Sequence, residues 1–180
     1  MIFHILMNLA NILTFSRILI VIPFVVTFYI HSPWASWLGI SLYWIACLTD
    51  YFDGVVARKK NQISNLGKFL DPVADKLLIS TTLIMLAGTG TLTGLSLIPA
   101  IIVLGRELFV SGLREHLFEQ KTQISVSGLA KWKTAVQMLS LSFLLVQAPE
   151  WVLEIGMALL WVSAALSAIT AYQYWIKVKI

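Results

Sequence analysis

The chain has 180 residues, of which 58% are hydrophobic and only 12% are charged, with a formal net charge of +4. Its mean hydropathy is +0.83. Soluble domains carry about 25% charged residues, so this composition excludes a soluble globular protein and indicates an integral membrane protein. The small positive charge suits anionic lipid headgroups, and we expect no nucleic-acid partner.

Apolar runs predict an all-α integral membrane protein with six transmembrane helices in a single domain, residues 1–180. Each run has roughly 18 to 25 residues, enough to cross a bilayer. The runs cover residues 12–31, 35–57, 69–89, 95–115, 129–147 and 152–175. Residues 1–9 form either a short interfacial helix or an extension of the first span. We expect the first span to be retained, because it lacks the flanks of a signal peptide.

Lysines and arginines predict the orientation of these spans. They gather in the link between the second and third spans, in the link between the fourth and fifth, and in the C-terminal tail. Under the positive-inside rule these regions are cytoplasmic. We therefore expect an inner-membrane protein with both termini and the second link on the cytoplasmic side.

All four aspartates of the chain lie within 26 residues, where the second span ends and the third begins: Asp50, Asp53, Asp71 and Asp75. A carboxylate beside lipid is costly and indicates a functional site. At roughly 100° per residue, each helix carries its two acids on one face, and the short link makes the helices antiparallel neighbours. Clustered carboxylates favour a hard divalent cation such as Mg²⁺ or Mn²⁺.

Two structural alternatives stand beside this metal site. Asp53 and Arg58 form an ordinary ion pair in one of them. In the other, Asp71 is a helix N-cap with Pro72 in the first turn. Four acids on two aligned faces favour the metal site over both alternatives.

Basic residues in the later spans predict a site for an anion. Arg106 and Arg114 lie in the fourth span, about 80° apart around the helix, and Lys131 and Lys133 begin the fifth. Together they suit an acceptor that carries a phosphate. Either arginine instead pairs with the glutamate that follows it, and either lysine instead lies at the lipid headgroups.

One pattern resembles the signature of the CDP-alcohol phosphotransferase family at all of its specified positions. It reads Asp50-x2-Asp53-Gly54-x2-Ala57-Arg58-x8-Gly67-x3-Asp71-x3-Asp75. The resemblance implies a homodimeric membrane enzyme in which two divalent ions meet the pyrophosphate of a CDP-linked substrate. A hydroxyl group then displaces CMP.

The same resemblance implies roles for individual residues. Asp75 is the catalytic base and also contacts metal. The metal ligands are Asp50, Asp53, Asp71 and Asp75. The residues that bind CDP are Asp50, Asp53, Gly54, Ala57, Arg58, Gly67 and Asp71. Considered without the resemblance, Gly54 and Gly67 equally suit tight helix packing.

Further strings resemble the same family. The segment from Asn8 to Arg17 is similar to the family's opening, with Ala10 where proline is usual, and gives Asn11, Thr14 and Arg17 a supporting role. Two later strings resemble the branch that uses CDP-diacylglycerol and sn-glycerol 3-phosphate. They read Gly105-Arg106-Glu107-Leu-Phe-Val-Ser111-Gly112-Leu113-Arg114-Glu115 and Lys131-Trp-Lys133-Thr134-x2-Gln137.

The resemblance thus implies phosphatidyl transfer, with the acceptor's phosphate bound by Arg106, Arg114, Lys131 and Lys133. Two alternatives remain open at this point. One is the same chemistry with another acceptor, such as inositol phosphate, serine or phosphatidylglycerol. The other is a divalent-cation transporter, although a transport path would carry polar residues through the full membrane depth.

Overall fold

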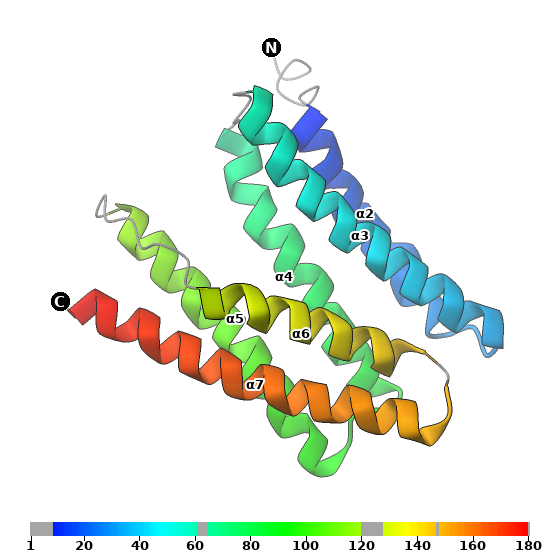
Figure 1. Ribbon diagram of the computed structural model, residues 1–180. Helices are drawn as coiled ribbons and strands as arrows, with labels where there is room; N and C mark the ends of the chain where they lie inside the picture. The colour runs from blue at the N-terminus through cyan, green and yellow to red at the C-terminus, as the bar shows by residue number, and fades with distance from the viewer. Residues whose placement is uncertain (1–8, 61–64, 120–127, 147, 180) are drawn as a thin grey trace. The chain divides into compact units, whose positions relative to one another are not determined.

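The computed structural model describes residues 9–60, 65–119, 128–146 and 148–179, and within these ranges it contains helices and no strand (Figure 1). The helices are α2 (Leu9–Thr27), α3 (Pro33–Lys60), α4 (Asn65–Gly88), the short 3₁₀ helix η1 (Gly94–Ser96), α5 (Leu97–Glu119), α6 (Gly128–Leu145) and α7 (Glu150–Lys179). The all-α prediction is confirmed, because each long helix contains most of one predicted span. Residues 1–8, where an interfacial helix was one alternative, lie outside the described residues.

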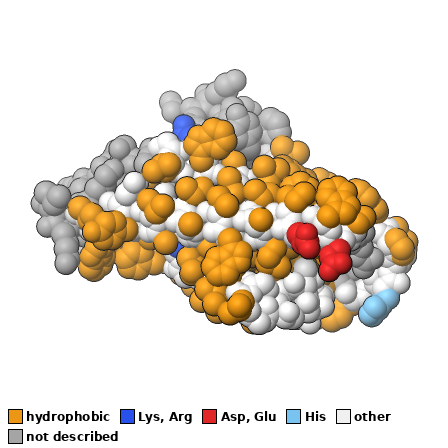
Figure 2. Space-filling model, turned by 60° about the horizontal axis from the view of Figure 1, so that its bottom comes forward, with side chains coloured by type: hydrophobic (Ala, Val, Ile, Leu, Met, Phe, Trp, Pro, Cys, Tyr) orange, Lys and Arg blue, Asp and Glu red, His pale blue; other side chains and the backbone are white. Residues whose placement is uncertain are grey.

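Two helical segments among the described residues are long and apolar enough to cross a membrane, Gly94–Leu113 and Glu150–Ile176. A shorter apolar helix covers Thr14–Thr27. Large apolar side chains are exposed on several helices, and hydrophobic side chains cover much of the described surface on the face shown in Figure 2. Extensive exposed apolar surface is typical of contact with lipid or another protein. Six membrane crossings remain a prediction.

The described chain forms two compact units, one up to Met85 and the other from Leu86 onward. In the first unit α2 packs against α3. Phe24 and Tyr43 are buried between them, with ring centroids 6.4 Å apart. A Cβ atom added to Gly39 would lie 2.8 Å from Thr27 Oγ1, so the glycine allows the two helices to approach closely.

In the second unit α7 packs against both α5 and α6. Phe109 of α5 and Trp175 of α7 have ring centroids 5.9 Å apart. Ser140 Oγ of α6 donates a 2.7 Å hydrogen bond to the Gly156 carbonyl oxygen of α7. A Cβ atom on Gly156 would lie 3.0 Å from Leu144 Cγ. The glycine therefore lets the backbone of α7 approach the side chains of the antiparallel helix α6 closely. The contact fixes the register of the two helices.

The link between α4 and α5 is a tight turn. Gly90 and Gly94 have φ angles of +79° and +54°, values that favour glycine. The Leu92 backbone N–H donates to the Leu86 carbonyl oxygen at 3.0 Å, and the Leu92 side chain is buried. This turn satisfies carbonyl groups at the end of α4.

Candidate functional site

The predicted aspartate pattern is helical on both sides of its link. Helix α3 carries Asp50, Asp53, Gly54, Ala57 and Arg58, and helix α4 carries Gly67, Asp71 and Asp75. Because α4 begins at Asn65 and Pro72 lies inside it, Asp71 is not a helix N-cap, and that alternative is wrong. The side chains of these residues other than Asp50 lie outside the described part of the structure.

Asp50 is held by a residue that sequence reasoning had placed only in support. Arg17 Nη1 of α2 donates a charge-assisted hydrogen bond to Asp50 Oδ1. The Arg17 side chain is 2% exposed and that of Asp50 is 48% exposed. The arginine thus anchors the first carboxylate of the pattern from the buried side, while the carboxylate remains accessible. Thr14 is buried about one helical turn earlier in α2. The Asn11 side chain lies outside the part of the structure that is described.

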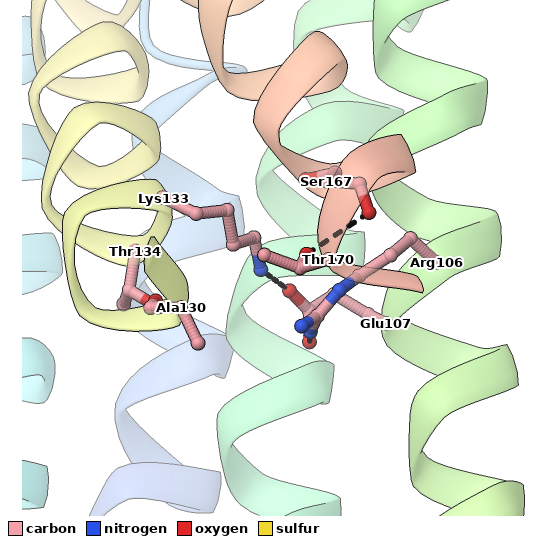
Figure 3. A network of polar contacts seen from close by, with 7 residues as sticks. All are labelled: Arg106, Glu107, Ala130, Lys133, Thr134, Ser167 and Thr170. Carbon is pink, nitrogen blue, oxygen red and sulfur yellow. Dashed lines mark hydrogen bonds and ion pairs between the residues drawn. The ribbon is translucent and has the colours of Figure 1, made fainter. Parts of the chain in front are cut away.

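A second charged cluster joins α5 to α6. Lys133 Nζ donates to Glu107 Oε1, and Arg106 Nη1 lies 3.5 Å from Glu107 Oε2 (Figure 3). The side chains of Lys133, Glu107 and Arg106 are 2%, 12% and 9% exposed, respectively. We call these three residues the charge cluster. It holds two cations and one carboxylate, so its formal charge is +1.

The charge cluster decides between the alternatives for two basic residues. Lys133 is buried in protein, so the headgroup alternative is wrong for this residue. Arg106 does pair with the glutamate that follows it, as one alternative had it, but the same glutamate also binds Lys133. Lys131 is exposed. Arg114 lies in α5, and its side chain is outside the part of the structure that is described.

A row of buried polar side chains runs along α6 and α7, and sequence reasoning had named only Lys133 and Gln137 from it. This polar seam consists of Lys133, Gln137 and Ser140 on α6 and Ser163, Ser167 and Thr170 on α7, all at most 2% exposed. Figure 3 shows Ser167 and Thr170 with the charge cluster, and Thr170 Oγ1 donates to the Ser167 carbonyl oxygen at 3.0 Å. Polar residues at helical spacing in otherwise apolar runs were the available signal.

The donor set suits the predicted cation. Carboxylate oxygens are the ligands that Mg²⁺ and Mn²⁺ prefer, and the pattern supplies four carboxylates from two helices. Asp50, the described member, is exposed enough to meet an ion. Among the described residues there is no group of three metal-binding side chains, so the fit rests on the chemistry of the donors.

A family model for CDP-alcohol phosphatidyltransferase matches residues 7–169. The chain belongs to the CDP-alcohol phosphatidyltransferase family. The matched range contains every candidate site residue. Membership of a transferase family gives no support to the cation-transporter alternative.

Individual relatives are similar over nearly the whole chain. A protein of Rickettsia bellii is 43% identical, over 93% of each chain. One of Salmonella paratyphi A is 37% identical, over 93% of this chain and 92% of the relative. One of Cereibacter sphaeroides is 33% identical, over 94% and 95%. Each of these relatives is named CDP-diacylglycerol--glycerol-3-phosphate 3-phosphatidyltransferase.

The charge cluster predicts strong coupling between Glu107 and Lys133. Glu107→Gln removes the carboxylate that Lys133 binds and should lower the free energy of unfolding by about 3–5 kcal/mol. Lys133→Met should cost less, because Glu107 keeps Arg106. The double variant should be more stable than the sum of the two losses implies, by about 0.5–3 kcal/mol.

Unfolding by SDS in mixed micelles measures these differences. Glu154→Gln is the matched control, since it makes the same chemical change at an exposed position of α7 and should shift stability by no more than about 0.5 kcal/mol. Additive losses in the double variant would contradict the coupling.

Proposed function

We propose that this chain transfers the phosphatidyl group of CDP-diacylglycerol to sn-glycerol 3-phosphate, giving phosphatidylglycerophosphate and CMP. The observation that carries the choice of acceptor is the charge cluster, which buries two cations against one carboxylate. Such a cluster suits an acceptor that brings a phosphate, whereas serine brings none. The names of the relatives support the same reaction.

The donor substrate is assigned to α3 and α4. Asp50, Asp53, Asp71 and Asp75 would hold the divalent cations, either Mg²⁺ or Mn²⁺ and two in number by resemblance. When bound, these cations would neutralise charge on the pyrophosphate and on the departing CMP. Arg17 keeps Asp50 oriented through its hydrogen bond. The resemblance assigns the CDP moiety to the aspartates and to Gly54, Ala57, Arg58 and Gly67.

The acceptor is assigned to α5 and α6. Its phosphate carries about two negative charges near neutral pH, and these compete with Glu107 for Lys133 and Arg106. Charge-assisted hydrogen bonds to a phosphate are among the stronger polar contacts. Arg114 and Lys131 join this set by resemblance.

The chemical step is one displacement. The glycerol 1-hydroxyl oxygen attacks the phosphorus that carries diacylglycerol, and Asp75 accepts the proton of that hydroxyl. A new oxygen–phosphorus bond forms as the bond from this phosphorus to the CMP oxygen breaks. This direct transfer requires both substrates on the enzyme together and forms no covalent phosphatidyl–enzyme species.

The reaction and its metal dependence are tested together with purified protein. CDP-diacylglycerol and labelled glycerol 3-phosphate should yield phosphatidylglycerophosphate and CMP in equal amounts. EDTA should abolish the reaction, and Mg²⁺ or Mn²⁺ should restore it. Asp50→Asn, Asp53→Asn and Asp71→Asn should each remove a metal ligand and give a rate far below normal at ordinary Mg²⁺. Asp75→Asn should lower kcat by about 100-fold or more.

Glu154→Gln controls for loss of a carboxylate elsewhere and should leave the rate unchanged. A near-normal rate for any of the first three aspartate variants at ordinary Mg²⁺ would refute its assignment as a ligand. Faster transfer to inositol phosphate, serine or phosphatidylglycerol than to glycerol 3-phosphate would refute the proposed acceptor.

The orientation remains a proposal from the distribution of lysine and arginine. We place both termini and the link after α3 on the cytoplasmic side of the inner membrane. In a Cys47→Ala background, Lys60→Cys should react with an impermeant thiol reagent only from the cytoplasmic side, and Thr91→Cys only from the opposite side. Reversed labelling would overturn the orientation. The single domain and the homodimer also remain predictions.

A further inference from the structure

Gln137 is a buried amide that the proposed reaction has not used. It lies on α6, and its side chain is 1% exposed. Its Oε1 atom has no hydrogen-bond partner within the described part of the chain. Buried polar atoms are normally paired, because an unpaired acceptor loses its hydration without compensation. The unpaired oxygen therefore points to a hydrogen-bond donor that the described residues do not supply.

The position of Gln137 relates this oxygen to the charge cluster. Gln137 follows Lys133 by four residues, which places the two side chains on the same face of α6, roughly 5–6 Å apart at their Cβ atoms. Side chains in a helix lean toward its N-terminus, so the Gln137 amide extends back toward the turn that carries Lys133. The unpaired oxygen thus lies on the face of α6 that carries Lys133, about one helical turn further along the helix.

Helix α7 carries a second buried atom without a described hydrogen-bond partner, and this atom is level with Lys133. Seven residues separate Ser140 from Lys133 on α6, and seven separate Gly156 from Ser163 on α7. Since Ser140 bonds to Gly156, two helical turns along the antiparallel pair bring Ser163 level with Lys133. Ser163 is fully buried, and its Oγ atom also has no hydrogen-bond partner in the described structure. This part of the polar seam is therefore equipped for a polar ligand.

We infer that Gln137 is a specificity-determining residue that accepts a hydrogen bond from the non-reacting C2 hydroxyl of the acceptor. The inference rests on the proposed function. Glycerol 3-phosphate carries this hydroxyl a few bonds from its phosphate, a spacing that one helical turn can match. With the phosphate at Lys133 and Arg106, the hydroxyl meets Gln137 Oε1. An acceptor that lacks the hydroxyl leaves that oxygen unpaired and is rejected.

The test compares two acceptors that differ only in this hydroxyl. The second acceptor, 3-hydroxypropyl phosphate, keeps the attacking hydroxyl and the phosphate but has hydrogen at C2. The wild-type enzyme should prefer glycerol 3-phosphate by about 5- to 150-fold in kcat/KM. Gln137→Met keeps the volume and removes the acceptor oxygen. It should lower kcat/KM for glycerol 3-phosphate by a similar factor and change that for the analogue by less than about threefold.

Two further variants separate recognition from structure. Ser140→Ala, on the same face of α6, removes a hydroxyl that already has a partner and should affect both acceptors equally. Gln137→Glu keeps an acceptor oxygen and should keep the preference for glycerol 3-phosphate. Should Gln137→Met fail to give a monodisperse protein, loss of the preference in Gln137→Glu would overturn the inference.

Each outcome has a separate meaning for the two proposals. Equal losses for both acceptors in Gln137→Met, or no loss for either, would show that the amide does not recognise the hydroxyl. A wild-type enzyme that uses both acceptors equally well would contradict the inference alone. A wild-type enzyme that transfers to neither would contradict the proposed function and, with it, the role of Gln137.

Discussion

The polar interior of the second unit depends on one carboxylate that serves two cations. Glu107 binds Lys133 and lies beside Arg106, and without it these two largely buried cations would lose the carboxylate that they share. A buried ion pair adds little net stability over an apolar pair, but loss of one partner is strongly destabilising. The arrangement therefore fits a functional role better than a purely structural one, because apolar residues would serve packing as well.

Under the proposed function, the charge cluster would also account for how a chain this apolar selects a charged acceptor. When the acceptor is absent, the cluster has a net charge of +1. One positive charge is left to attract an anion, and both cations still have Glu107 as a partner. A phosphate can then replace part of the contacts of Glu107 without a new charge being buried alone. In the proposed donor site, Arg17 has a similar role, because its hydrogen bond orients Asp50, one carboxylate of the proposed metal site.

The sequence predicted the helices better than the contacts between them. Apolar runs located all six long helices described. The third run was predicted to begin at residue 69, however, because the residues just after Gln62 are partly polar, whereas α4 begins at Asn65. Lys131 and Lys133 look alike in sequence, yet packing of α6 buries one and exposes the other. Glu107 could be proposed as a partner for its neighbour Arg106, whereas its ion pair with Lys133, 26 residues away, required the tertiary structure.

The central claim is that the buried cation of α6 binds the phosphate of the acceptor, and steady-state kinetics of Lys133→Met test it most directly. The KM for glycerol 3-phosphate should rise by about 10- to 150-fold, because a charge-assisted hydrogen bond is lost. The KM for CDP-diacylglycerol should stay near its wild-type value, and the exposed neighbour variant Lys131→Met should show a smaller rise. A folded Lys133→Met enzyme with an unchanged KM for glycerol 3-phosphate, or with equal rises for both substrates, would contradict the claim.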